Sequence, residues 1–301
     1  MTRNNIKNKL TMNRNNIKNY FVMSVLILSA SSMIQNNAFA ATAPNLGTSS
    51  TFGVLAATTV TNDPTLGAGT VITGDLGISP NGLTSITGFP PGTVTGSIEA
   101  GNAAAAQAQT DAHAAFAALN SQACTTTYPP VQDLGGKTLT PGVYCDSTSF
   151  SINAGETLTL NGAGVYIFKA GSTLVTVTGA NVVLTGGATA ANVFWAVGSS
   201  ATLAAPGSVA TSPTHFEGTI IALTSISETG GTTGTHLDVN CGLIALNGAV
   251  TLASSTSITV CNGGTGGNGQ GNNGQGNNGQ GNNGQGNNGQ GNNGQGNNGQ
   301  G

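Results

Sequence analysis

Short apolar runs recur through the second half of the chain and limit the folds it can adopt. The run at residues 220–224 (IIALT) returns 23 residues later at residues 243–247 (LIALN), and related runs lie upstream at residues 194–198 and 167–171. A fifth is indicated by Gly-Val-Tyr at residues 142–144, which is repeated at 164–166. A period of 20–30 residues, with β-type runs between glycines, is typical of a β-solenoid whose coils bury their apolar faces only by stacking.

The recurring strand is apolar on both sides. If Lys169 points outward, Tyr166, Phe168 and Ala170 point inward, and the other copies can be aligned on this one. The alignment predicts an inward set of Val193, Trp195, Val197, Ile221, Leu223, Ile244 and Leu246. It predicts an outward set of Ile167, Phe194, Ala196, Ile220, Ala222, Leu243 and Ala245. Because a strand that is apolar on both sides is normally covered on both sides, another element should lie against the outward set.

A second strand in each coil has a different pattern. In residues 149–152, 200–203, 225–227 and 249–252, apolar residues alternate with small Ser, Thr and Ala residues. Residues 172–176 belong to the series, but their phase is ambiguous. Stacked coils would therefore present a flat array of hydroxyl and methyl groups, with strands about 4.8 Å apart and alternate side chains about 6.6 Å apart.

One segment favours a helix. Residues 103–118 are rich in Ala and Gln, which are strong helix formers, and Asn102 is suited to the N-cap. A stripe at helical spacing is formed by Ala105, Ala108, Ala112, Phe116 and Leu119. We expect a helix near residues 102–120 that packs on the outward apolar set. An exposed linker helix is the alternative, and it would leave both apolar surfaces bare.

The two ends of the chain differ from the middle. Residues 1–40 have basic residues, an apolar run at 21–28 and Ala38-Phe39-Ala40, which together indicate a signal peptide cleaved after Ala40. Translation could start at Met1 or Met12. An anchoring helix is disfavoured because the apolar run is too short to span a bilayer. Residues 263–301 repeat Gly-Gln-Gly-Asn-Asn and are expected to be disordered, which leaves residues 41–262 as the folded domain.

Removal of the signal peptide makes the protein more strongly acidic. Lys137 and Lys169 then remain against ten acidic residues, a formal charge of −8. This balance argues against nucleic acid, whose phosphates require clustered Lys and Arg, and against anionic membranes. We expect a secreted protein.

All four cysteines lie in the exported part, where disulfides are favoured over a zinc site. The sequence allows three pairings. We favour Cys124–Cys145 and Cys241–Cys261, which close intervals of 21 and 20 residues and would each contribute about 3 kcal/mol.

The ionisable residues form no recognisable catalytic motif. A solenoid polysaccharide lyase or hydrolase would need paired carboxylates, bound calcium or a basic catalyst. The ten acidic residues show no paired spacing, and the three histidines are isolated in the sequence. We therefore expect no enzyme, no metal and no cofactor. A passive adhesin or surface module is the remaining alternative, and it predicts a solenoid without an ordered hydroxyl face.

Residues 46–260 resemble the microbial ice-binding proteins that fold as a discontinuous, right-handed β-solenoid. The resemblance is carried by residues 46–56, 71–80, 88–92, 133–136, 139–144, 192–195 and 247–252. It implies a mainly β fold of triangular cross-section, with three β faces and one long α-helix along one of them. It also implies that the partner is an ice crystal surface, bound through the face of small residues. By position, that face would comprise Ser149, Ser151, Thr173, Ser200, Thr202, Thr224, Ser225, Ser227, Ala249 and Thr251. Separately, we expect a monomer.

Overall fold

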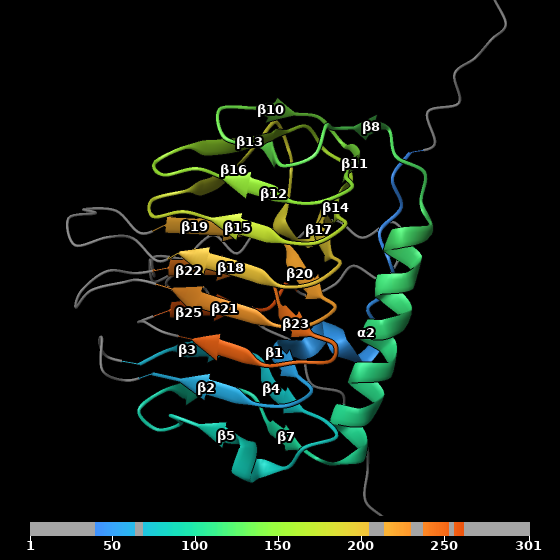
Figure 1. The fold of residues 1–301 in the computed structure, drawn as a ribbon. Coiled ribbons are helices and arrows are strands. Elements are labelled where there is room, and N and C mark those ends of the chain that lie inside the picture. Colours follow the sequence, from blue (N-terminus) through green and yellow to red (C-terminus); the bar gives the residue numbers. More distant parts are fainter. Residues whose placement is uncertain (1–39, 64–68, 205–213, 230–236, 253–255, 262–301) are drawn as a thin grey trace, which may run out of the picture. The chain divides into compact units, whose positions relative to one another are not determined.

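The structure is a computed structural model. It describes residues 40–63, 69–204, 214–229, 237–252 and 256–261, which all belong to one compact unit. The signal peptide predicted for residues 1–40 lies outside the described residues except for Ala40, and the tail predicted for 263–301 lies wholly outside them. The unit is a stack of parallel strands with one long helix, α2, beside it (Figure 1). The predicted class of fold, a β-solenoid with a helix along one face, is confirmed.

Three faces of parallel sheet surround the core. The face nearest to α2, called here the covered face, has the strand order β7 (Ile98–Ala100), β4 (Asp75–Ile78), β1 (Phe52–Ala56), β23 (Leu243–Ala245), β20 (Thr219–Ala222), β17 (Val193–Val197), β14 (Tyr166–Ala170), β11 (Gly142–Asp146) and β8 (Thr126–Thr127). The second, called the hydroxyl face, has the order β5 (Ile86–Thr87), β2 (Val60–Asn62), β24 (Val250–Leu252), β21 (Ile226–Thr229), β18 (Ala201–Ala204), β15 (Leu174–Thr176), β12 (Phe150–Ile152) and β9 (Gln132–Asp133).

The third face is made of two sheets. One contains β10 (Thr138–Leu139), β13 (Thr157–Asn161) and β16 (Asn181–Thr185), and the other contains β19 (Thr214–Glu217), β22 (Leu237–Asn240), β25 (Thr256–Thr259), β3 (Val71–Thr73) and β6 (Thr93–Val94). The His215 N–H donates to Asn181 Oδ1 at 3.0 Å and links the two sheets. Short 3₁₀ turns, η2 (Gly47–Thr51), η4 (Leu83–Ser85) and η5 (Ala190–Asn192), complete the described elements.

The coils do not stack in the order of the sequence. The first coil, β1 to β3, lies between the second coil and the last coil, β23 to β25. In Figure 1 the blue strands β1 and β2 therefore lie beside the orange strands at the end of the chain. After β7 the chain runs along the stack through α2 and resumes at β8, at the opposite end of the covered face.

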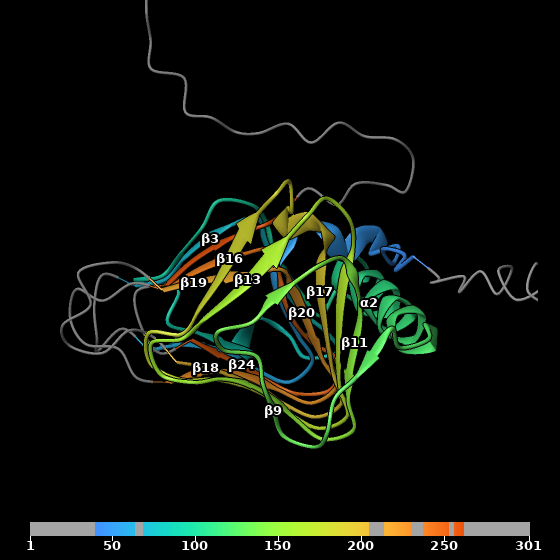
Figure 2. The same ribbon diagram turned by 90° about the horizontal axis from the view of Figure 1, so that it is seen from above.

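The core lies between the three faces, which form a triangle when the stack is viewed along its length (Figure 2). Aromatic side chains on successive coils stack inside it, with ring centroids 5.3 Å apart for Tyr144 and Phe168 and 4.0 Å apart for Phe168 and Trp195. Trp195 is 1% exposed, and its Nε1–H donates to the Glu217 carbonyl oxygen at 3.0 Å. Trp195 is thus a core residue.

Helix α2 (Ala103–Ser121) covers the outer side of the covered face, as predicted. Asn102 is its N-cap, because its side chain accepts the Ala105 N–H at 3.0 Å. Its buried stripe includes Ala105, Ala108, Ala112 and Leu119, while Phe116 is partly buried. Small alanines allow the helix axis to approach the strands closely.

The predicted phase was wrong in two of the four copies of the apolar strand. Trp195 pairs with Ile220 and Ala196 with Ile221, while Ile220 pairs with Leu243. The shift of one residue reverses every side chain in both copies. The residues that point into the core are therefore Ile220, Ala222, Leu243 and Ala245, whereas Ile221, Ile244 and Leu246 pack beneath the helix and Leu223 is 37% exposed. These two copies contain no charged residue comparable to Lys169, so an apolar pattern on both sides could not reveal the phase.

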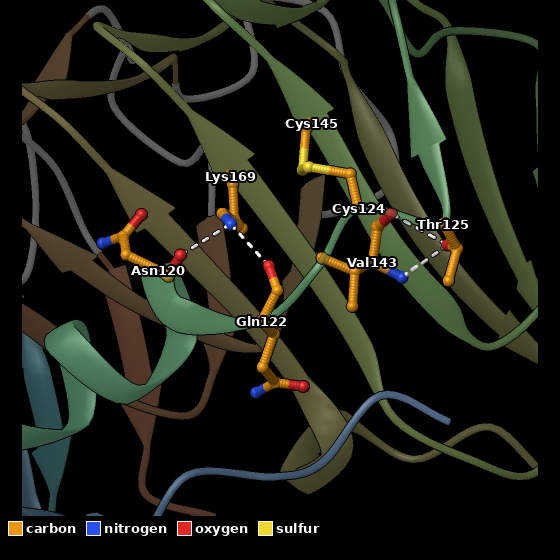
Figure 3. The surroundings of a disulfide bond; sticks show 7 residues. All are labelled: Asn120, Gln122, Cys124, Thr125, Val143, Cys145 and Lys169. Atoms are coloured by element: carbon orange, nitrogen blue, oxygen red, sulfur yellow. Dashed lines mark hydrogen bonds between the residues drawn. A yellow bond between two sulfur atoms is a disulfide. The ribbon is translucent and has the colours of Figure 1, made fainter. Parts of the chain in front are cut away.

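Both predicted disulfides are present, Cys124–Cys145 and Cys241–Cys261. The Cys124–Cys145 disulfide links the segment that follows α2 to β11 (Figure 3). Close to it, Lys169 contacts the C-terminal end of α2. There, Lys169 on β14 points outward as predicted, and its Nζ donates to the carbonyl oxygens of Asn120 and Gln122, both at 2.8 Å. Burial lowers the pKa of Lys169. A cation at this end of a helix interacts favourably with its unpaired carbonyl groups.

Lys169→Met should therefore destabilise the domain. Methionine keeps most of the apolar stem but leaves two carbonyl oxygens without their donor, and we expect a loss of about 1–2 kcal/mol in the free energy of unfolding. Urea denaturation followed by circular dichroism would measure it. An unchanged midpoint would mean that water replaces the ammonium group at no cost.

Asp111 on α2 holds the N-terminal segment against the helix. Its Oδ2 accepts the backbone N–H and the hydroxyl of Thr48, both at 2.7 Å. The N–H of Thr48, and then its hydroxyl, hold the pKa of Asp111 below its ordinary value. A depressed pKa in the folded state contributes stability above the unfolded pKa, and that contribution is lost as pH falls through the folded pKa.

Asp111→Asn should therefore lower stability at pH 7 but progressively less in acid. We expect a difference of about 0.5–1 kcal/mol at pH 7, reduced because water partly screens the carboxylate. The difference should narrow below about pH 4, where aspartate protonates. Urea midpoints of both proteins across this range provide the measurement, and a difference independent of pH would contradict the assigned role.

Candidate functional site

The hydroxyl face carries two outward rows of small side chains that run across the coils. Strand pairing fixes the central row as Ser151, Val175, Thr202, Ser227, Thr251, Thr61 and Thr87, in that spatial order. The flanking row lies two residues earlier on each strand and contains Ser149, Thr173, Ser200, Ser225, Ala249 and Thr59. These side chains are half-buried apart from Thr59 and Thr87, which are exposed, and apolar residues between them face the core.

The structure brings together nine of the ten residues predicted for this face, namely Ser149, Ser151, Thr173, Ser200, Thr202, Ser225, Ser227, Ala249 and Thr251. Thr224 lies instead in the turn between β20 and β21, where it is exposed and its N–H donates to the Ser199 carbonyl oxygen at 2.8 Å. The ambiguous phase of residues 172–176 is settled with Leu174 inward and with Thr173 and Val175 outward.

Three threonines of this face were missed by the sequence reasoning. Thr59 and Thr61 belong to the first coil, and Thr61 pairs with Thr251 on one side and Thr87 on the other. Residues 59–61 do alternate in the right way, Thr-Val-Thr, but nothing local shows that they lie beside the last coil. Only the topology of the stack adds them to the row.

The hydroxyl groups of the face differ in their hydrogen bonds. Ser149 Oγ and Thr173 Oγ1 bond to each other at 2.7 Å, and Ser225 Oγ accepts the Ala249 N–H at 3.2 Å. In the part of the chain that the structure describes, the hydroxyls of Thr61, Thr87, Thr202, Ser227 and Thr251 bond to no protein group. Much of the central row is therefore free to bind water.

Charged groups lie mainly elsewhere. On the third face, His215 Nδ1 is 3.3 Å from Asp238 Oδ2, and Asn240 Nδ2 donates to Glu217 Oε1 at 2.9 Å. Burial, the largest influence, raises the pKa of Glu217. From Ser151 to Thr87 the central row contains no charged residue.

An acidic pair that the sequence did not reveal lies near the end of the stack at β9. Burial, and then the neighbouring Asp133 carboxylate, raise the pKa of Glu156. Asp133 also accepts the Gly135 N–H at 2.9 Å and bonds to Asn153 Nδ2. It extends the central row beyond Ser151, because the two residues pair across β9 and β12.

Two further features of the described residues bear on function. No helix among them has both the length and the apolar character needed to cross a membrane. The described ranges also contain no cluster of three or more His, Cys, Asp or Glu side chains suited to a metal ion.

Comparisons with known proteins agree on one family. A family model described as Ice-binding-like matches residues 54–258. An ice-binding protein of Nostoc sp. (strain HG1) is 41% identical over 242 residues, which cover 79% of this chain and 82% of the relative. An ice-binding protein of Flavobacterium frigoris (strain PS1) is 32% identical, covering 70% and 75%. The crystal structure of an ice-binding protein from the Antarctic ascomycete Antarctomyces psychrotrophicus superposes with a TM-score of 0.62 and 36% identity, covering 73% of this chain and 100% of that one.

Proposed function

Because the chain belongs to the Ice-binding-like family, we propose that its solenoid binds ice through the hydroxyl face. Adsorbed protein would hinder the growth of the crystal, which separates the melting and freezing points and slows recrystallisation. The observation that carries the proposal is the central row, whose hydroxyls are in register across successive coils and are largely free of protein partners.

The chemistry of this row suits a surface made of water. Hydroxyls can anchor water molecules by hydrogen bonds, and the methyl groups of threonine leave neighbouring water free to adopt an ordered arrangement. Strands about 4.8 Å apart repeat these groups regularly, and the hydrogen-bonded stack keeps the spacing fixed. Such a receptor needs no catalytic group.

The other two faces are less suitable. Helix α2 covers the outer side of the covered face. The third face carries the close contact between His215 and Asp238 and the Glu217 carboxylate. A carboxylate orients the hydrogens of its surrounding water toward itself, which conflicts with the mixed donor and acceptor pattern of ice.

We also propose that the protein acts outside the cell, as a monomer, after cleavage behind Ala40. The basic and apolar pattern of residues 1–40 supports export, and two disulfides suit an oxidising compartment. Mass spectrometry of the secreted protein and size-exclusion chromatography would test cleavage and oligomeric state.

The proposal of ice binding is tested by growing single ice crystals in a solution of the protein that begins at Ala41. We expect faceted crystals, a gap between melting and freezing points, and slower coarsening of polycrystalline ice. If the folded protein neither shapes crystals nor slows coarsening, the proposal is wrong and a passive adhesive module becomes the better interpretation.

A further inference from the structure

The hydroxyl face is not uniform from end to end. On β9, β12 and β15 it contains the Asp133 carboxylate, the bonded pair Ser149 and Thr173, and Val175. On β18, β21, β24, β2 and β5, the central row consists of Thr202, Ser227, Thr251, Thr61 and Thr87. The central row therefore divides into an end that contains Asp133, Ser151 and Val175 and an end in which, for the part of the chain that the structure describes, every residue carries a hydroxyl without a protein partner.

Three features make the first end a poor match for ice. A hydroxyl proton shared between Ser149 and Thr173 is not available to water. Val175 offers no hydrogen bond and interrupts the row. The Asp133 carboxyl group is already engaged by the protein, because it accepts the Gly135 N–H at 2.9 Å and bonds to Asn153 Nδ2. Val131, two residues before Asp133, is 69% exposed.

The central row of the second end has none of these features, although in its flanking row Ser225 Oγ accepts the Ala249 N–H at 3.2 Å, and Asp63 lies two residues after Thr61. Its central row runs in register from Thr202 through Ser227 and Thr251 to Thr61 and Thr87, and it crosses the junction between the last coil and the first. At about 4.8 Å per strand, these five side chains span about 19 Å. Within the described residues their hydroxyls have no protein partner.

From this asymmetry, and resting on the proposed function, we infer that ice is contacted by the half of the hydroxyl face between β18 and β5. Thr61 and Thr87, which come from the first two coils, are then contact residues on equal terms with Thr251. Thr61 and Thr87 join this surface only because the first coil inserts beside the last coil, so the full surface assembles when the two ends of the domain meet.

Thr61→Tyr and Ser151→Tyr test the inference, because both positions are half-buried and lie in opposite halves of the central row. We expect Thr61→Tyr to lose at least four-fifths of the gap between melting and freezing points, and Ser151→Tyr to retain most of it. Thr87→Tyr, at an exposed position on β5, should reproduce the loss if Thr61→Tyr folds poorly. Circular dichroism melting curves would verify folding of each variant.

Equal losses at Thr61 and Ser151, or a larger loss at Ser151, would overturn the division of the face while leaving ice binding by the whole face in place. If the unmodified protein is active and all three variants, Thr61→Tyr, Thr87→Tyr and Ser151→Tyr, keep full activity, ice does not contact the hydroxyl face. The two failures are thus distinguishable.

Discussion

Thr202→Tyr and Thr251→Tyr are each expected to remove most of the gap between melting and freezing points while leaving the protein folded. Both threonines point outward in the central row, and neither strand uses them to fill the core. A tyrosine ring projects several ångströms further than a threonine side chain. It would hold an advancing ice surface away from the neighbouring coils, so the match would be lost over several strands and not only at the substituted residue.

A matched control is Thr73→Tyr. Thr73 is an exposed threonine on β3 in the third face, beside Thr259, so the substitution has the same size and the same strand context. The control should retain full activity. Nanolitre osmometry measures the gap, and circular dichroism verifies folding. Folded Thr202→Tyr and Thr251→Tyr proteins with full activity would show that ice binds another face.

Much of this architecture could be predicted because the sequence repeats its chemistry once per coil. Strands that are apolar on both sides require a covering element, and the alanine-rich stripe of residues 103–118 was the available one. Alternation of small hydroxyl residues with apolar residues identified the uncovered face. The folded protein combines these patterns as expected, with α2 on one face and the hydroxyl rows on another.

What the sequence could not predict depends on contacts between distant segments. Ile220 and Leu243 were assigned outward because an apolar strand looks the same in either phase. Thr61 lies beside Thr251 although 190 positions separate them in the chain. Asp133 and Glu156 form an acidic pair only because their coils are adjacent. In each case the side-chain neighbours depend on the register between adjacent coils. That register is fixed by how the coils stack and not by the local sequence.

The covering helix keeps the apolar outer side of the covered face out of contact with solvent, next to the open hydroxyl face. Without it, Ile167, Phe194, Ile221 and Ile244 would form an exposed apolar ladder next to the hydroxyl rows. Exposed apolar area of that extent favours association between proteins and not adsorption to ice. By covering these side chains, α2 leaves the hydroxyl face as the surface available for binding. This arrangement depends on tight packing of α2 against the covered face.

Ala112→Glu should therefore have the largest effect on stability of any single change considered. Ala112 is 0% exposed in the middle of α2 and packs with the outer side chains of the covered face. A carboxylate there must either lose its water without a partner or push the helix away from the strands. We expect a loss of about 3–5 kcal/mol, a large part of the total stability of a domain. Thermal unfolding followed by circular dichroism measures it.

Ala114→Glu is the matched control, because Ala114 lies two residues along the same helix and is exposed. It has the same change of charge and of helix propensity, so we expect less than about 0.5 kcal/mol of destabilisation. Similar melting temperatures for both variants would mean that the helix is not held against the covered face. Destabilisation of Ala112→Glu alone would instead show that the close contact between the alanines of α2 and the apolar outer side of the covered face stabilises the solenoid.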